Sequence, residues 1–314
     1  MKQPLVSVGV PTYNRPENLL RCLEAIESQS YANLEIIVSD NCSPDDKVDT
    51  IIKNFMSTDS RIKHFRQSQN IGAARNFKFV FEQACGDYFL WAADDDQWLG
   101  TDLIANLIEY APHHTLTFPD ACHASSPDVS ILSDYRICKE QWDYTTTFCW
   151  TGAGYPYYGM YNLKKMSEHK ITFPFDNDLI YYGEGMFLHN IFLNSLTKFV
   201  QDNKIMFTFG GSLPKNKNEQ ILAFLAYTHR AIDFYRTANI SIEKKMSAVY
   251  IITQRYGKSI FELAGLLQQD KQNTFIDSTN IVRKKHKYYT EEDVEALMHP
   301  LRAALHVLVS QLKK

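Results

Sequence analysis

The sequence predicts an α/β fold: a mostly parallel sheet flanked by helices, followed by a helical C-terminal region. Two observations lead to this prediction. Short apolar runs alternate with amphipathic helical patterns through the first third of the chain, which is typical of parallel sheets with right-handed crossovers. Polar segments directly follow three of those runs, and ligands of such sheets bind beyond the carboxyl ends of the strands.

The predicted elements follow one another closely. Residues 5–10, 34–39, 62–66 and 87–93 read as strands. Helical patterns cover residues 14–26, 43–55 and 71–84. Asn14 is expected to cap the first helix, with Pro16 in its first turn and Glu17 completing a capping box. The apolar face of that helix is predicted to consist of Leu19, Leu20, Leu23 and Ile26.

The second half of the chain is less regular. Residues 112–145 mix polar residues with short strand-like pieces, and 148–161 is rich in aromatics and glycine. A helical pattern returns at 218–265, and a polar stretch at 268–290 precedes a last helix at 290–312. An apolar stripe on that last helix, from Val294 to Leu308, fits an acceptor cover, an oligomer interface or a membrane contact.

Composition excludes several classes of protein. Of 314 residues, 45% are apolar and 22% are charged, which is globular composition. A formal charge of −3 gives no support for a nucleic-acid partner. The six cysteines form no CxxC pair, so we expect reduced structural thiols in a cytoplasmic protein. We expect neither a signal peptide nor a membrane span.

Three consecutive aspartates follow the fourth apolar run, in the stretch FLWAADDDQWLG at Phe89–Gly100. A hard divalent cation, Mn²⁺ or Mg²⁺, prefers oxygen ligands and often bridges carboxylates to substrate phosphates. On an extended strand Asp94 and Asp96 would point the same way. If the chain turns there, Asp95 could take the metal role instead. The alternative is a solvated acidic turn, which the preceding buried strand disfavours.

The loop after the first strand, Pro11-Thr-Tyr-Asn-Arg15, lacks the GxGxxG pattern of dinucleotide-binding folds. It offers hydroxyl, aromatic and guanidinium groups that suit a base and ribose. Asp40, at the end of the second strand, could accept a hydrogen bond from a uracil-type N–H. A simple turn at Asp40-Asn41 is the alternative.

The segments PTYNR, EIIVSDN, QNIGAARN and GDYFLWAADDD, in this order, resemble family-2 glycosyltransferases of the GT-A fold over roughly residues 4–110. The resemblance implies a Rossmann-like sheet and a metal-dependent, inverting transfer of a sugar from a nucleotide-diphosphate donor, expected to be a UDP-sugar. It implies a nucleotide site formed by Pro11, Thr12, Tyr13, Arg15, Asp40, Arg75, Asp94 and Asp95. Asp94–Asp96 corresponds to the DXD element of the family. Ala93 stands where many members have another aspartate, so the metal ligand is either Asp95 or Asp96.

The catalytic base is expected further along the chain. The segment around Tyr182-Gly-Glu-Gly resembles the Gly-Glu-Asp-like segment of relatives, with Gly185 where an aspartate is frequent. Glu184 is the predicted base, because direct displacement needs a carboxylate to deprotonate the acceptor hydroxyl. Asp176 and Asp178 are the fallback. A mere helix cap at Glu184 is the competing interpretation.

Further side chains have two interpretations each. Trp150, Tyr155, Tyr157 and Tyr158 fit an acceptor-binding wall or ordinary core. His189 and His229 are metal-ligand candidates, although a lone histidine is more often structural. The basic run at 283–287 fits a solvated loop better than a contact with the inner face of a membrane.

The predicted organisation has three parts: a nucleotide-sugar-binding half at 1–110, an acceptor-binding half at 111–215 and a helical region at 216–314. The expected acceptor is a glycan or lipid-linked glycan, as in surface polysaccharide synthesis, with a peripheral membrane contact and a homo-oligomer left open. A nucleotidyltransferase and a non-catalytic sugar-nucleotide-binding module are the alternatives. The first usually has a Gly-rich loop near its N-terminus that this chain lacks, and Gly185 keeps the second open.

Overall fold

The computed structural model describes residues 3–151, 154–173, 183–207, 227–228 and 230–263. The chain divides into two compact units. The first consists of Met1–Gln141, Ala153–Ile180 and Asn190–Gly211, and the second of Trp142–Gly152, Tyr181–His189 and Ser212–Lys314. The predicted nucleotide half therefore belongs to the first unit, whereas the boundaries predicted at 110 and 215 stay predictions.

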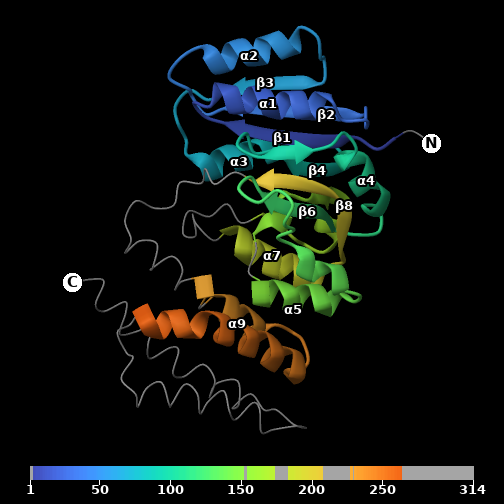
Figure 1. The fold of residues 1–314 in the computed structure, drawn as a ribbon, viewed down its shortest axis with the longest axis vertical. Helices are drawn as coiled ribbons and strands as arrows, with labels where there is room; N and C mark the ends of the chain where they lie inside the picture. The colour runs from blue at the N-terminus through green and yellow to red at the C-terminus, as the bar shows by residue number, and fades with distance from the viewer. Residues whose placement is uncertain (1–2, 152–153, 174–182, 208–226, 229, 264–314) are drawn as a thin grey trace. The chain divides into compact units, whose positions relative to one another are not determined.

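The first unit is built on a sheet whose described strands follow the order β3-β2-β1-β4-β7-β6-β8-β5 (Figure 1). The strands are β1 (Val6–Thr12), β2 (Leu34–Asp40), β3 (Ile62–Arg66), β4 (Tyr88–Trp91), β5 (Gln97–Leu99), β6 (Leu116–His123), β7 (Met160–Asn162) and β8 (Thr197–Phe207). The first four are mutually parallel, and so are β6 and β8. β7 runs antiparallel between β4 and β6, and β5 is antiparallel to β8. The α/β class predicted from the sequence is confirmed.

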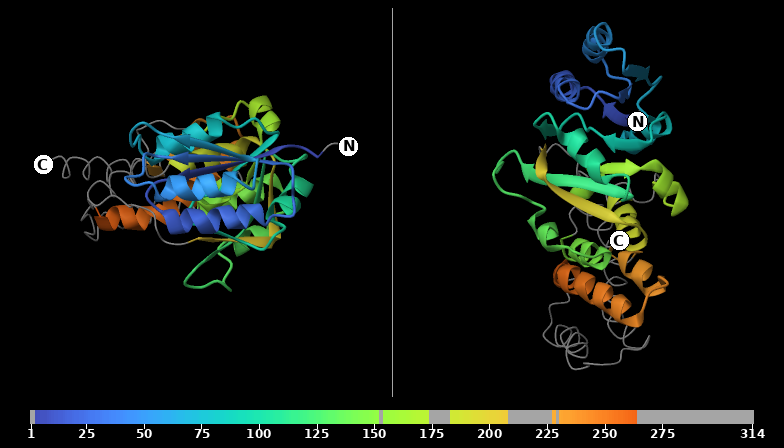
Figure 2. Two further views of the ribbon diagram at one scale, coloured as in Figure 1. Left: turned by 90° about the horizontal axis from the view of Figure 1, so that it is seen from above. Right: turned by 90° about the vertical axis from the view of Figure 1, so that its right-hand side faces the viewer.

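Helices cover both faces of the parallel part. α1 (Pro16–Glu27) and α2 (Lys47–Met56) lie on one face, and α3 (Ala73–Glu82) packs on β1 and β2 from the other (Figure 2). This follows from right-handed crossovers: the chain moves outward from β1 to β3 and then returns past them to β4. Shorter helical segments of the first unit are α4 (Leu103–Tyr110), α6 (Leu163–Glu168), η1 (Ser133–Ile137) and η2 (Tyr155–Tyr158).

The central strand β1 shows why the apolar runs become strands. All seven of its residues are buried, as expected for a parallel strand covered on both faces. Gly9 lets the neighbouring side chains close in, because a Cβ there would lie 2.8 Å from the ring of Phe89 and 2.9 Å from Val80. Pro11 is part of the strand rather than its end, at a point beyond the pairing of β1 with β4.

Two local predictions about the first helix are wrong. Asn14 is not its cap: it adopts a left-handed conformation with φ of 53°, and Arg15 occupies the capping position. The amide of Asn14 instead donates to the hydroxyl of Ser43, 2.8 Å away. Leu20 is 38% exposed, and Cys22 takes its place on the buried face. Pro16 does begin the helix, as predicted.

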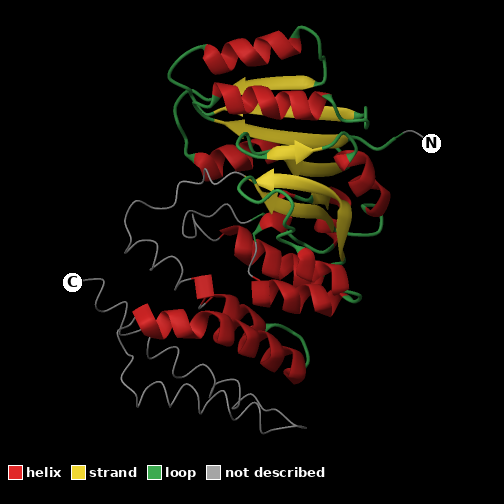
Figure 3. Cartoon of the chain, in the orientation of Figure 1, coloured by secondary structure: helices red, strands yellow, loops and turns green. Residues whose placement is uncertain are grey.

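The irregular middle of the chain contains more order than the sequence indicated. β6 and α5 (Gln141–Thr151) arise from the stretch expected to hold only strand-like pieces, and β8 is an eleven-residue strand (Figure 3). β8 bends because the register of its pairing with β6 shifts between Pro119 and Asp120. These strands extend the sheet beyond the four that the sequence predicts.

The second unit is helical in its described residues. Residues 230–237 are helical, α9 spans Ile242–Leu263, and α7 (Gly183–Asn194) has its first half in this unit. Buried side chains such as Ile232, Tyr235 and Val249 form its core. The predicted last helix, with its stripe from Val294 to Leu308, and the basic run at 283–287 lie outside the described residues.

Candidate active site at the carboxyl edge of the sheet

The ends of β1, β2 and β4 meet at one edge of the first unit's sheet, because the three strands are parallel and adjacent. The two loops after β1 and β2 are tied together. The amide of Asn41 donates to the carbonyl of Thr12 over 2.9 Å, and the amide of Asn14 donates to Ser43. The chain thus brings together segments that are distant in the sequence.

The three aspartates lie on a turn at this edge. Asp94 and Asp95 form the turn, and the amide of Asp96 donates to the carbonyl of Ala93 over 3.1 Å. The chain therefore turns at the aspartates instead of continuing as an extended strand. This is the condition under which Asp95 was expected as a metal ligand. The side chains of Asp94 and Asp95 are 5% and 19% exposed.

Asp94 links the aspartate turn to the loop after β1. One oxygen accepts a hydrogen bond from the hydroxyl of Thr12 over 2.7 Å, and the other lies 3.0 Å from Nη1 of Arg15. The same Nη1 lies 2.7 Å from Oδ2 of Asp95. Arg15 therefore contacts two carboxylates through one nitrogen, a role that the sequence did not predict.

Burial raises the pKa of the Asp94 carboxyl, and the hydrogen bond from Thr12 and the charge of Arg15 oppose that rise. Burial alone would lower the pKa of Arg15, but the charges of Asp94 and Asp95 raise it. Under this turn, burial raises the pKa of the Cys22 thiol and the three aspartates raise it further. The thiol is thus held neutral, and the edge concentrates negative charge with Arg15 in contact with it.

Asp40 is fully buried at the end of β2. Its Oδ1 accepts from the amide of Ser43 over 2.9 Å and from the hydroxyl of Ser43 over 2.6 Å. Its Oδ2 has no hydrogen-bond partner among the described residues, and Nη1 of Arg66 lies 3.7 Å away. Buried acceptors are normally satisfied, so this oxygen is an unusual feature of the edge.

The remaining predicted nucleotide residues occupy different environments. Tyr13 is 42% exposed beside the aspartate turn, and Pro11 is buried within β1. Arg75 is exposed in the first turn of α3, and within the described ranges its side chain makes no hydrogen bond or ion pair. The residue before that helix, Gly72, has a φ of 86°, which few other residues tolerate.

The predicted base belongs to the second unit. Glu184 is in the first turn of α7, where desolvation raises the pKa of its carboxyl although the side chain keeps access to water. The next residue has no room for a side chain: a Cβ at Gly185 would lie 2.6 Å from the ring of Tyr227. An aspartate at this position is therefore excluded unless Tyr227 moves.

His189 is structural rather than a metal ligand in this conformation. Both of its ring nitrogens are engaged, Nδ1 with the hydroxyl of Tyr235 at 2.9 Å and Nε2 with that of Tyr227 at 3.1 Å. Burial lowers the pKa of His189 to about 3, so the imidazole is neutral. His229, Asp176 and Asp178 lie outside the described residues.

The four aromatic residues considered for an acceptor wall do not share one environment. Trp150 is 58% exposed on α5 of the second unit. Tyr157 is buried in the first unit and stacks on Trp91 with ring centroids 4.5 Å apart, and Tyr158 is half-buried beside it. The core interpretation therefore fits Tyr157 better than the acceptor interpretation.

The sequence reasoning missed His123. The hydroxyl of Tyr155 lies 3.0 Å from Nε2 of His123, at the carboxyl end of β6. Burial raises the pKa of Tyr155, and the charge of Asp96 raises it further, so the phenol of Tyr155 lies near enough to the aspartate turn to interact with its charge. The sequence could have indicated His123 only through the prediction of a strand that ends there.

The carboxylates of the aspartate turn fit a divalent cation whose coordination shell is completed by a bound ligand. Within the described part of the chain, no group of three or more His, Cys, Asp or Glu side chains could hold a metal ion by itself. Mg²⁺-type sites commonly use one or two carboxylates together with substrate phosphates and water. Asp95 and Asp96, both partly accessible on one turn, match that donor set.

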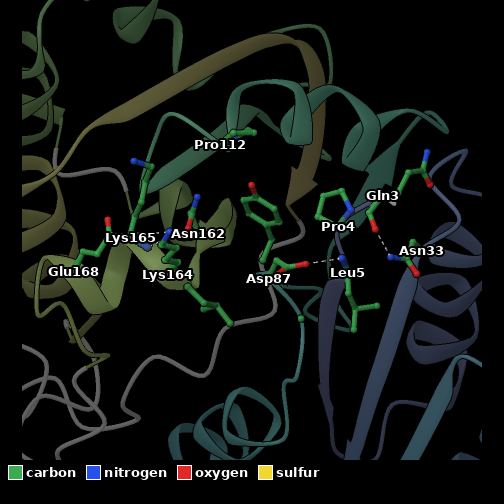
Figure 4. A pocket seen from close by; sticks show the side chains of 13 residues that line it. Gln3, Pro4, Leu5, Asn33, Asp87, Pro112, Asn162, Lys164, Lys165 and Glu168 are labelled. Atoms are coloured by element: carbon green, nitrogen blue, oxygen red, sulfur yellow. Dashed lines mark hydrogen bonds and ion pairs between the residues drawn. The ribbon is translucent and has the colours of Figure 1, made fainter. Parts of the chain in front are cut away.

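A separate cavity of about 810 Å³ opens at the opposite, amino edge of the sheet (Figure 4). Its polar groups serve one another: Asp87 accepts from the amide of Leu5, and Asn162 accepts from that of Lys165. Its two lysines are offset by Asp87 and Glu168. Because ligands of parallel sheets bind at the carboxyl edge, this cavity is not the candidate active site.

Comparison with known proteins gives a partial family match. Residues 7–144 match the family model described as "Glycosyl transferase family 2". The first unit thus carries the fold that the sequence motifs predicted. The match covers somewhat under half of the chain and includes Thr12, Arg15, Asp40 and the aspartate turn.

Individual relatives are more distant. A stretch of 97 residues is 38% identical to GalNAc(5)-diNAcBac-PP-undecaprenol beta-1,3-glucosyltransferase of Campylobacter jejuni, covering 31% of this chain and 31% of the relative. The chain thus spans about a third of that relative's length. The putative glycosyltransferase EpsH of Bacillus subtilis is 25% identical over 301 residues, which cover 95% of this chain and 76% of that protein.

Among solved structures, S. aureus TarS (residues 1–349) aligns over 98% of this chain and 91% of its own with a TM-score of 0.68 and 18% identity. TarS has also been crystallised with UDP-GlcNAc. At this identity the likeness shows the fold alone, which is the GT-A fold. None of the helices in the described part of the chain is long and apolar enough to cross a membrane.

Proposed function

We propose that the protein is a metal-dependent, inverting glycosyltransferase that uses a nucleotide-diphosphate sugar, a UDP-sugar, as donor. The observation that carries the proposal is the set of contacts at the carboxyl edge, where Thr12 and Arg15 join the loop after β1 to Asp94 and Asp95. The family-model match over residues 7–144 supports the same reaction class.

The base and ribose of the donor are assigned to the loops after β1 and β2. Asp40 has a buried carboxylate oxygen without a hydrogen-bond partner in the described residues, and a uracil-type N–H would satisfy it. Binding there includes a side-chain rearrangement that uncovers the oxygen. The exposed ring of Tyr13 is available for stacking on the base, and the exposed guanidinium of Arg75 for the phosphates.

Asp95 and Asp96 are assigned to Mn²⁺ or Mg²⁺. When bound, the cation would neutralise the diphosphate and so make it a better leaving group. The chain's contribution is to hold the carboxylates at one place, because β4 fixes the start of the turn and the amide of Asp96 closes it on Ala93.

Glu184 is assigned as the base. In a single displacement, the acceptor oxygen attacks the anomeric carbon from the side opposite the diphosphate, and the acceptor proton passes to the Glu184 carboxylate. The anomeric configuration inverts because there is only one displacement. The raised pKa of Glu184 suits a base.

The donor and acceptor classes are drawn from the relatives. The UDP-GlcNAc complex of TarS supports UDP, and the undecaprenol-linked substrate in the name of the Campylobacter relative supports a lipid-linked glycan acceptor. A role in surface polysaccharide synthesis follows from that acceptor class. A non-catalytic sugar-nucleotide-binding module is the second candidate, because the aspartate frequent at position 185 is replaced by Gly185.

The test is a donor-hydrolysis screen with UDP-, GDP-, CMP- and TDP-sugars in the presence of Mn²⁺, followed by the variants Glu184→Gln and Asp95→Asn. We expect hydrolysis of a UDP-sugar that falls by roughly 100-fold or more in either variant. Glu243→Gln is the matched control, since Glu243 also lies in the first turn of a helix of the second unit.

The outcomes of this screen distinguish a transferase from a binding module. Retained UDP binding with no hydrolysis of any donor, in wild type and variants alike, would favour the binding module. Wild-type turnover in Glu184→Gln would remove Glu184 as base and leave the donor site intact. Equal losses in Glu184→Gln and Glu243→Gln would indicate damage to the helical unit instead of lost chemistry.

A further inference from the structure

The contact between Arg15 and the aspartate turn joins one cationic side chain to two carboxylates. A single nitrogen, Nη1, lies 3.0 Å from Oδ1 of Asp94 and 2.7 Å from Oδ2 of Asp95. Asp94 is buried and Asp95 largely so, while the Arg15 side chain is 39% exposed. The positive charge that relieves the repulsion between these carboxylates therefore comes from the protein itself.

This guanidinium lies on a carboxylate that the metal would use. An oxygen of Asp95 bound to a divalent cation would place two positive charges close together if Arg15 stayed where it is. Such proximity is unfavourable at contact distances even near a protein surface. Arg15 and a cation on Asp95 therefore exclude one another, at least in part.

The backbone allows Arg15 to leave. Arg15 is at the capping position of α1, with φ of −136° and ψ of 61°, so it lies outside the helical part of the chain. A guanidinium on such a residue can change its rotamer without disturbing the helix. Arginine is also suited to bidentate recognition of phosphate oxygens, which a nucleotide diphosphate provides.

We propose that Arg15 acts as an exchangeable counter-ion of the aspartate turn. Its guanidinium contacts Asp95 when no sugar-nucleotide donor is bound, and it is displaced when the metal and the nucleotide diphosphate bind together. The displaced guanidinium then contacts the diphosphate. The chain consequently binds the metal weakly alone and more tightly with the nucleotide. This inference rests on the proposed donor and metal sites and assigns Arg15 to the diphosphate rather than to the base and ribose.

The experiment measures Mn²⁺ binding by electron paramagnetic resonance titration, with and without UDP, for wild type, Arg15→Gln and Arg15→Lys. Without UDP, Arg15→Gln should bind Mn²⁺ more tightly, by roughly fivefold, the ratio that corresponds to removal of one partly exposed ion pair. Arg15→Lys keeps the charge and should stay near wild type. With UDP present, the advantage of Arg15→Gln should shrink, because the variant has lost a phosphate contact.

Arg21→Gln is the matched control. It removes the same charge from α1, and its guanidinium contacts Asn18 instead of the aspartates. Equal tightening in Arg21→Gln and Arg15→Gln would overturn the inference in favour of a net-charge effect. So would Mn²⁺ affinity in Arg15→Gln that is equal to or weaker than that of wild type without UDP.

The result also separates this inference from the proposed function. Mn²⁺ binding to wild type that UDP enhances, with no difference in Arg15→Gln, overturns the exchange and leaves the metal site intact. Absence of Mn²⁺ binding in every variant, even with UDP, overturns the metal site and the exchange with it. Circular dichroism spectra equal to that of wild type establish that the variants are folded.

Discussion

Two buried carboxylates of the first unit, Glu35 and Asp94, have opposite environments. Glu35 lies near the start of β2 and is 7% exposed. It accepts hydrogen bonds from the hydroxyl of Ser7, from Nζ of Lys63 at 2.7 Å and from the amide of Cys85 at 2.5 Å. Burial alone would raise the pKa of Glu35, but these three donors lower it. The pKa of Asp94, after the end of β4, is raised by burial despite its partners.

The difference separates the two edges of one sheet. At the amino edge the described polar groups satisfy one another, so burial of a charge there serves stability. At the carboxyl edge, burial raises the pKa of Asp94 although Thr12 and Arg15 contact it, and Oδ2 of Asp40 accepts no hydrogen bond in the described structure, with Arg66 3.7 Å away. A ligand at this edge could supply contacts that folding leaves incomplete.

The largest effect on stability is expected for Glu35→Ala. The substitution leaves Lys63, Ser7 and the amide of Cys85 without their shared acceptor, so the free energy of unfolding should fall by about 3 kcal/mol. Urea unfolding measures it. Glu82→Ala, which removes an exposed ion pair with Lys78, is the control and should change little. A loss below about 1 kcal/mol in Glu35→Ala would show that the polar contacts of the amino edge do not stabilise the fold.

His189 in the second unit is a buried, neutral side chain with hydrogen-bond partners. The unfolded chain protonates His189 below the ordinary histidine pKa of 6.5, whereas the folded chain holds it neutral until about 3. The unfolded state thus binds the extra proton, and stability falls as the pH falls. Between about pH 7.5 and about pH 5 this group should cost about 2 kcal/mol. Urea unfolding at both values should show a smaller change in His189→Gln, and an unchanged pH dependence would contradict the assignment.

Asp94→Asn tests the uncompensated edge. Because the folded pKa of Asp94 is raised, the stabilising contribution of its protonated form is lost as the pH rises above the unfolded value. The variant should therefore gain stability relative to wild type as the pH rises from about 4 to about 7. Thermal unfolding at both values checks this. A relative loss on raising the pH would mean that Arg15 overcompensates the burial of Asp94.

The smallest effect is expected at the amino-edge cavity. Lys164 forms an exposed pair with Glu168 at 3.9 Å, and such pairs are worth less than about 0.5 kcal/mol. Lys164→Ala should leave both stability and donor hydrolysis unchanged. A large loss of hydrolysis in this variant would move the active site from the carboxyl edge to the amino edge.

The sequence predicted the parallel half of the sheet well for a physical reason. Strands buried on both faces are continuous apolar runs, and β1, β2 and β4 have that pattern, whereas β3 at the end of the sheet is partly exposed. The strands β5 and β7 contain three residues each, too few for any periodicity to register. β8 has two short apolar segments separated by the polar run Gln201–Lys204, and its pairing with β6 shifts register there, so the same reasoning does not find it as one strand.

Part of the candidate site could also be predicted from the sequence. Strand ends indicated Thr12, Asp40 and the aspartates, because parallel strands must end at one edge. The contact of Arg15 with residues almost eighty positions away could not be read from local patterns. The obstruction at Gly185 by Tyr227 likewise depends on tertiary packing alone.

Calorimetric titration of UDP, in the presence of Mn²⁺, into wild type, Asp40→Asn and Lys164→Ala tests most directly whether the carboxyl edge is the donor site. Asparagine keeps the oxygen that Ser43 contacts and replaces Oδ2, which accepts no hydrogen bond in the described structure, with an N–H donor, which opposes the base. We predict UDP binding at least about tenfold weaker in Asp40→Asn, the scale of one lost charge-assisted hydrogen bond, and unchanged in Lys164→Ala. Unchanged binding in Asp40→Asn with a loss in Lys164→Ala would contradict a donor site at the carboxyl edge.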